Sequence, residues 1–88
     1  MTVIQIECMA ENGLHARPAA LVAKQAKEFS CKAYIVNEDN NKRADARSVT
    51  SIMTLGVKKG THLRVECNGS DEQDAAKAIG DLIIKIDK

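Results

Sequence analysis

Aromatic residues are almost absent from this 88-residue chain, which contains one tyrosine, one phenylalanine and no tryptophan. Proteins that bind single-stranded nucleic acid stack bases on several aromatic side chains, so the composition disfavours that class of partner. Charge of one sign is also scarce, because 13 Lys and Arg residues against 12 Asp and Glu residues leave a net charge of +1. The sequence contains no block of basic residues that could bind along the phosphate backbone of a nucleic acid, and we therefore expect no nucleic-acid partner.

Long apolar runs and a cysteine framework are missing as well. No stretch approaches the ~20 apolar residues of a membrane-spanning helix, and the amino-terminal residues do not read as a signal peptide. We therefore expect a cytoplasmic protein without membrane insertion. Cys8, Cys31 and Cys67 are widely spaced and odd in number, which favours reduced thiols over disulfides or a C-x-x-C site. A chain of this length supports one small core, which predicts a single domain over residues 1–88.

Hydrophobic spacing predicts four strands and three helices. Alternating apolar residues indicate strands at 2–8, 32–36, 43–46 and 62–68, with a turn at 37–42. Apolar residues three and four apart indicate a helix at 16–28, a short helix after Ser48 and a last helix after Ser70. Ser48 is expected to cap the short helix, Gly56 to end it, and Ser70 with Gln73 to form a capping box. Half-buried strands of this kind predict a sheet with helices on one face and solvent on the other.

The segment from Asn12 to Pro18 places a histidine, an arginine and a proline at the start of the first helix. The unpaired N–H groups and the positive dipole of a first helical turn attract anions such as a phosphoryl group. The same field disfavours imidazolium, so His15 is expected to be neutral and nucleophilic, while Arg17 pairs with phosphoryl oxygens. No P-loop or carboxylate cluster for Mg²⁺ is evident, which predicts a protein as the phosphate donor rather than ATP.

The block Gly13-Leu14-His15-Ala16-Arg17-Pro18-Ala19, followed by Ser48-Val49, Met53-Thr54-Leu55-Gly56 and Lys59-Gly60, resembles HPr, the histidine-containing phosphocarrier family of the bacterial phosphoenolpyruvate:sugar phosphotransferase system. The resemblance covers nearly the whole chain. It implies an α+β fold, an open-faced β-sandwich in which a four-stranded antiparallel sheet carries three helices on one face. It also implies that enzyme I phosphorylates His15 on Nδ1, that Arg17 assists, and that the phosphate passes to IIA domains of sugar permeases. Such a protein is a carrier without a cofactor and not an independent catalyst.

The family's docking surface maps onto small, mildly apolar or basic residues of the first two helices, namely Ala16, Ala20, Lys24, Lys27, Val49, Thr50 and Met53. These residues suit brief contacts with several partners. A carrier whose working face must stay accessible is expected to be a monomer.

Ser48 matches the serine that the HPr kinase/phosphorylase modifies in many Gram-positive relatives, where a catabolite regulator is a further partner. The family continues Ile-Met-Gly after this serine, whereas this chain has Val49-Thr50-Ser51, and a serine that only caps a helix needs no kinase. The turn at 37–42 is about two residues longer than is typical of the family. We expect it to lie on the far side of the short third strand, away from the transfer site.

Two other functions remain open from the sequence. A regulatory paralogue of the nitrogen-related or catabolite-control type shares the histidine motif and acts through its phosphorylation state. The enzyme-class alternative is a metal or nucleophilic site built from His15, Cys31 and His62, although their spacing matches no ligand pattern. His62 alternates with Leu63 on the fourth strand and is expected to face solvent.

Overall fold

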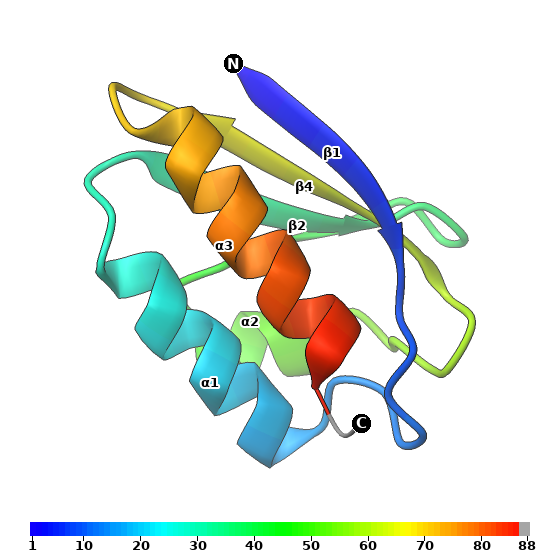
Figure 1. Cartoon of the computed structure of the whole chain (residues 1–88). Helices are drawn as coiled ribbons and strands as arrows, with labels where there is room; N and C mark the ends of the chain where they lie inside the picture. The colour runs from blue at the N-terminus through cyan, green and yellow to red at the C-terminus, as the bar shows by residue number, and fades with distance from the viewer. Residues whose placement is uncertain (87–88) are drawn as a thin grey trace.

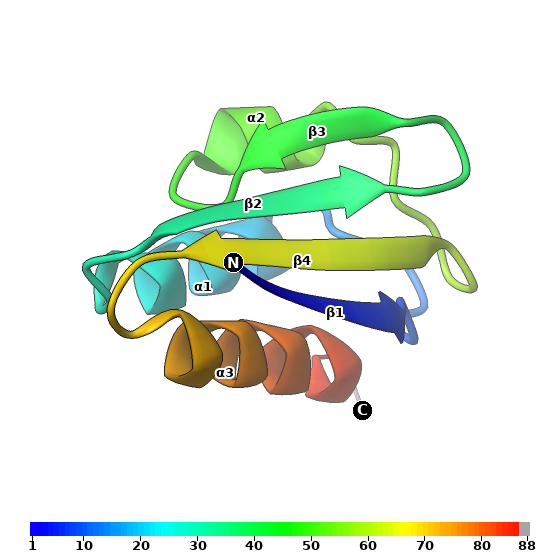
Figure 2. The same ribbon diagram turned by 90° about the horizontal axis from the view of Figure 1, so that it is seen from above.

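Four antiparallel strands in the order β1-β4-β2-β3 carry three helices on one face in the computed structural model, which describes residues 1–86 (Figure 1). The strands are β1 (Thr2–Glu7), β2 (Lys32–Asn37), β3 (Lys42–Asp45) and β4 (His62–Asn68). The helices are α1 (Ala16–Lys27), α2 (Val49–Met53) and α3 (Glu72–Lys85). Seen from above, the strands lie in front of α1 (Figure 2). The element order and the α+β class confirm the predictions from the sequence.

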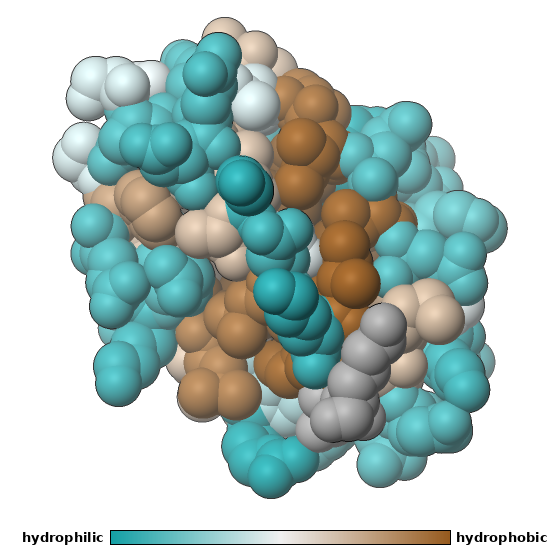
Figure 3. All heavy atoms as spheres, viewed as in Figure 1, coloured by the Kyte–Doolittle hydropathy of each residue, from teal (hydrophilic) through white to brown (hydrophobic). Residues whose placement is uncertain are grey.

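The core lies between the sheet and the helices, and it is aliphatic because the chain has so few aromatic residues. In β4, Leu63, Val65 and Cys67 are buried, whereas the residues between them are exposed or half-buried. Gly80 of α3 lies so close to β1 that a Cβ atom there would overlap the side chain of Ile4. Hydrophobic side chains fill the space beside α3, whose outer surface is polar (Figure 3). Within residues 1–86, no helix is both long and apolar enough to cross a membrane.

The other face of the sheet carries a network of charged side chains instead of helices. Arg64 bridges two carboxylates, with its Nε 2.8 Å from Glu66 and its Nη1 3.2 Å from Glu38. Arg43 lies 3.5 Å from Glu66 and stacks over the ring of Tyr34 at 3.7 Å from the centroid. Each exposed pair adds little stability, so the main effect of the network is to make this face polar.

The prediction of the third strand and of the turn before it was partly wrong. Strand β2 extends to Asn37, which was expected in the turn, and β3 runs from Lys42 to Asp45 rather than over 43–46. Asn37 is only 2% exposed, and its Nδ2 donates a hydrogen bond to the Leu55 carbonyl at 2.8 Å. Because a buried amide must be hydrogen-bonded, this contact explains how a turn-forming residue type occupies a buried strand end.

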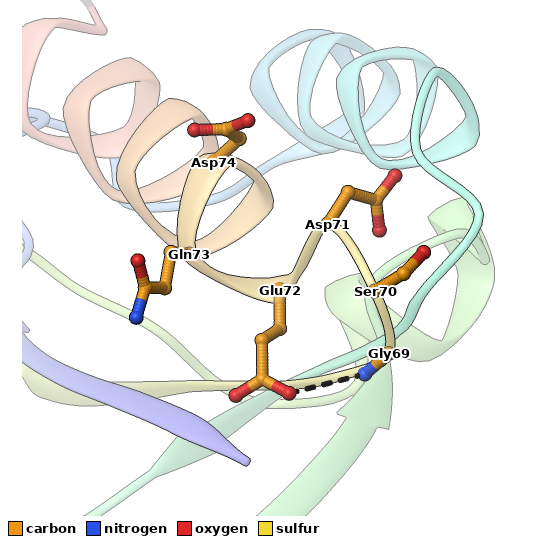
Figure 4. A pocket seen from close by; sticks show the side chains of 6 residues that line it. All are labelled: Gly69, Ser70, Asp71, Glu72, Gln73 and Asp74. Carbon is orange, nitrogen blue, oxygen red and sulfur yellow. Dashed lines mark hydrogen bonds between the residues drawn. The ribbon is translucent and has the colours of Figure 1, made fainter.

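The capping box expected from Ser70 and Gln73 is also wrong. Helix α3 begins at Glu72, with Asp71 in the N-cap position but without a capping hydrogen bond from its side chain. Glu72 itself reaches back to accept a hydrogen bond from the Gly69 amide at 3.3 Å (Figure 4). The carboxylates of Asp71 and Glu72 point to opposite sides of the chain (Figure 4).

Asp71 is used for a tertiary contact rather than for capping its own helix. Its two carboxylate oxygens accept hydrogen bonds from the backbone amides of Ser30 at 2.8 Å and Cys31 at 3.0 Å. The pKa of Asp71 is lowered, chiefly because the Ser30 amide donates to the ionised carboxyl group. The start of α3 thereby holds the loop that follows α1.

We predict that Asp71→Asn destabilises the protein at neutral pH and reduces the acid sensitivity of its stability. The folded-state pKa of Asp71 lies below its ordinary value of 3.8. Its stabilising effect is therefore complete above that value and is lost as the pH falls through the folded-state pKa. Thermal unfolding followed by circular dichroism across an acidic pH series should show the melting temperatures of the variant and the wild type converging at low pH. Asp74→Asn, at an exposed carboxylate in the same helical turn, is the control, and parallel curves for Asp71→Asn would contradict the prediction.

All three cysteines are free thiols in the interior, as expected. Cys8 and Cys67 are fully buried and Cys31 is 2% exposed. Burial raises the pKa of Cys67 to about 12, and it also raises the pKa of Cys31. Because the thiolate is the reactive form, these groups are chemically quiet in the folded protein.

Iodoacetamide should therefore leave the native protein unmodified at neutral pH. The same reagent should add to all three cysteines once urea has unfolded the chain. Intact-mass spectrometry counts the adducts in both states. Rapid labelling of one cysteine without urea would show that a thiol is far more accessible than the structure indicates.

Candidate functional site

His15 stands immediately before α1, in the N-cap position predicted from the sequence. Its backbone is extended, with φ −80° and ψ −169°, and its carbonyl oxygen accepts the first helical hydrogen bond from Ala19 at 2.9 Å. The side chain is exposed and forms no capping hydrogen bond to the helix. The imidazole is therefore presented at the protein surface, on a backbone that the helix fixes in place.

The residues before His15 fix the direction from which the chain enters α1. Gly13 has φ +67°, a conformation that residues with a side chain rarely adopt, and a Cβ atom there would overlap the Val57 carbonyl oxygen. Leu14 is only 4% exposed and packs into the core. The backbone on the amino-terminal side of His15 is thus held by a close backbone contact and a buried side chain.

The first turn of α1 is suited to an anion. Ala16 and Arg17 are its first two residues, so their amides lie at the start of the helix. Pro18 follows, is buried, and contributes no N–H group. This turn contains no acidic residue, so no carboxylate of its own opposes the positive end of the helix dipole. Arg17 is exposed next to it and adds a permanent positive charge.

The residues expected to form a docking surface lie on two helices that contact each other. Ala16, Ala20, Lys24 and Lys27 are all exposed along α1. In α2, Thr50 is exposed and Met53 is 48% exposed. Val49, the remaining expected residue, is half-buried, and Leu21 on α1 is an exposed apolar residue, at 46%, that the sequence analysis did not include. Leu21 could have been found from its place beside Ala20 on the helix.

Ser48 is the N-cap of α2, as predicted. Its Oγ accepts a hydrogen bond from the Ser51 amide at 3.2 Å, which is the bond that a capping serine forms. Gly56 follows the helix with φ +69°, in the left-handed conformation expected for a residue that ends it. This capping role explains a serine at position 48 without any modification.

The structure separates the residues of the proposed metal or nucleophilic site. His15 precedes α1 and Cys31 follows it, and a helix of 12 residues is about 18 Å long. Cys31 is buried, whereas His62 is exposed at the start of β4 with its Nδ1 3.5 Å from Asp39. Among residues 1–86, no three His, Cys, Asp or Glu side chains are grouped so as to hold a metal ion. The hypothesis of a site built from His15, Cys31 and His62 is therefore wrong, because these residues do not lie together.

The turn between β2 and β3 contacts the segment that follows α2. Asn40 donates a hydrogen bond to the Leu55 carbonyl at 3.1 Å, which is the same oxygen that Asn37 binds. Leu55 lies two residues after the end of α2 and two residues before Val57, on which Gly13 packs. The expectation that this turn does not touch the transfer site remains a prediction, while its side chains reach Leu55 in the segment against which Gly13 packs.

Curated proteins similar to this chain include a phosphocarrier protein and a multiphosphoryl transfer protein. It is 40% identical to the phosphocarrier protein HPr of Haemophilus influenzae over 78 residues, which cover 89% of each chain. It is 43% identical to the multiphosphoryl transfer protein of Salmonella typhimurium over 74 residues, 83% of this chain. The match covers only 20% of that longer relative.

Solved structures similar to this one include members of the same group. HPr-C-His from Thermoanaerobacter tengcongensis is 41% identical and superposes with a TM-score of 0.87, over 94% of this chain and 91% of that one. The catabolite repression protein Crh of Bacillus subtilis, described as a swapped dimer, is 30% identical with a TM-score of 0.75, over 94% and 93% of the two chains.

A family model described as the HPr component phosphorylation site of the phosphotransferase system matches residues 3–85. The match includes the segment around His15 and nearly all of the described structure. This chain therefore belongs to the HPr phosphocarrier family of the phosphotransferase system.

Proposed function

We propose that this protein accepts a phosphoryl group from enzyme I on His15 and passes it to IIA domains of sugar permeases. The observation that carries the proposal is an exposed imidazole at the start of a 12-residue helix whose first turn has no acidic residue. Membership of the HPr family supports it independently. The protein acts as a phosphorylated carrier and not as a catalyst of its own.

In the proposed step, the lone pair of Nδ1 of neutral His15 attacks the phosphorus atom of the donor phosphohistidine. The new N–P bond forms while the P–N bond of the donor breaks, and the donor ring nitrogen keeps that electron pair. His15 retains its hydrogen on Nε2 as the phosphoryl group arrives. Amides of the first turn of α1 and the guanidinium of Arg17 then stabilise the negative phosphoryl oxygens. The reverse sequence delivers the group to the IIA domain without a metal or a nucleotide.

Partners dock on the surface around His15. The stripe formed by Ala16, Ala20, Lys24 and Lys27 offers small side chains near the histidine and basic ones farther along α1. Such a surface binds acidic partners through fast, weak contacts that release easily. Because both successive partners need this surface, we propose that the protein acts as a monomer.

A regulatory role is the second candidate, because the chain is also similar to the catabolite repression protein Crh. In that role the phosphorylation state controls binding to a regulator instead of feeding sugar uptake. Onward transfer separates the two roles, since a sugar-branch carrier delivers its phosphate to a IIA domain. A protein that becomes phosphorylated but never passes the group on fits the regulatory role.

Incubation with enzyme I and phosphoenolpyruvate should produce an acid-labile phosphohistidine, and His15→Ala should abolish it completely. Phosphorus NMR identifies the ring nitrogen, for which we expect Nδ1. His62→Ala is the control, because His62 is the only other histidine of the chain. Phosphate retained in His15→Ala but lost in His62→Ala would overturn the assignment.

Phosphorylation of Ser48 is a proposed regulatory step, and charge can be tested separately from capping. The added charge of about −2 would lie beside the docking surface and repel an acidic partner. Ser48→Asp and Ser48→Asn both keep a capping side chain, whereas loss of the cap costs about 1 kcal/mol. We predict that Ser48→Asp raises the KM for transfer from enzyme I, while Ser48→Asn leaves it unchanged and both melt as the wild type does. Equal KM values for the two variants would argue against regulation by charge.

A further inference from the structure

The chain that carries His15 is joined by backbone contacts to another segment. We call residues 8–15 the His15 loop and residues 55–62 the supporting segment. Backbone hydrogen bonds join the two, from Cys8 N to Thr61 O at 2.9 Å and from Gly60 N to Cys8 O at 2.7 Å. Beyond these bonds, Gly13 lies against the Val57 carbonyl. The position of the His15 loop therefore depends on where the supporting segment lies.

The last residue of β2 and the turn that follows it hold the supporting segment at both ends. At its start, the Leu55 carbonyl accepts hydrogen bonds from the side-chain amides of Asn37 at 2.8 Å and Asn40 at 3.1 Å. At its end, the His62 carbonyl accepts from the Glu38 amide at 2.9 Å, and the His62 amide donates to Asp39 at 3.3 Å. Four consecutive residues, Asn37 at the end of β2 and residues 38–40 in the turn, thus bind both ends of the segment.

The side chains of Asn37 and Asn40 each form a second hydrogen bond, which limits their rotation. The Oδ1 of Asn37 accepts from the Asp39 amide at 2.9 Å, and the Oδ1 of Asn40 accepts from the Lys42 amide at 3.0 Å. With both oxygens held by the turn, each Nδ2 is directed to Leu55. Leu55 is only 1% exposed, so its carbonyl group lies where lost hydrogen bonds are not readily replaced by water.

We propose that Asn37 and Asn40 are positioning residues for phosphoryl transfer at His15, acting through Leu55 and the supporting segment. The inference rests on the function proposed for His15. Neither asparagine touches the reacting atoms. Their effect is to keep the His15 loop in one position, so that the imidazole meets its donor with little further ordering.

Asn40 provides the test, because its side chain is exposed and its replacement leaves the core intact. Asn40→Ala removes both of its hydrogen bonds, whereas Asn40→Asp keeps the acceptor for the Lys42 amide and loses only the donor to Leu55. Asn68→Ala and Asn68→Asp are the matched controls, since Asn68 is also exposed but lies at the opposite end of β4. Thermal unfolding of each variant confirms that the measurements are made on folded protein.

The first reaction uses phosphoramidate, a small donor that transfers its phosphoryl group to imidazole and releases ammonia without any docking. We expect both Asn40 variants to be phosphorylated on His15 about two- to tenfold more slowly than the wild type, with displaced His15 ring resonances in NMR spectra. The Asn68 variants should match the wild type. Phosphorylation of both Asn40 variants at the wild-type rate, with unmoved ring resonances, would overturn the inference.

The second reaction uses phosphorylated enzyme I and separates this inference from the proposed function. We expect Asn40→Ala to lower kcat and leave KM unchanged, because the docking residues are intact. Wild-type protein that reacts with phosphoramidate on His15 but not with enzyme I would refute the proposed function and leave the phosphoramidate comparison as the test of positioning. An effect of Asn40→Ala on KM alone would count against positioning.

Discussion

The backbone of Gly13 lies against the carbonyl group of Val57, and the geometry around His15 depends on this contact. It requires both a positive φ and the absence of a Cβ atom, and only glycine satisfies both without strain. Two residues later the chain enters α1, so an error at Gly13 would rotate the histidine away from the first turn of the helix. The close contact between Gly13 and the Val57 carbonyl thus connects the loop, helix α1 and the segment that follows α2.

A rigid support under an exposed side chain suits the carrier role proposed for His15, in which several partners would meet the same side chain in turn. The backbone at His15 is held from below by the supporting segment and from the carboxyl side by the helix, while its side chain remains at the surface. Each partner then encounters the same arrangement and needs to order little on binding. In the proposed function, the fold thereby combines a fixed position for the nucleophile with a docking surface of small side chains.

Local patterns predicted most of the fold, and the errors arose where distant residues decide the outcome. The alternation in β4 and the helical spacing of α1 lie within single segments, and both elements were predicted. Asn37 looked like a turn residue because its partner, Leu55, lies 18 positions away. Ser70 and Gln73 have capping-box spacing, but the start of α3 is set by Asp71, which binds amides 40 and 41 positions earlier. The His15 motif was recognisable because its residues are contiguous, whereas the contribution of Asn40 became visible only in three dimensions.

The charged network on the uncovered face of the sheet makes this side of the molecule different from the side that carries the helices. Arg64 and Arg43 alternate there with Glu66 and Glu38, so positive and negative groups largely neutralise one another. Such a mixed-charge surface has neither the exposed apolar patch that binds a partner nor the potential of one sign that attracts one. This face therefore lacks a feature that would hold a partner, which fits the proposal that partners dock around His15 on the helical side.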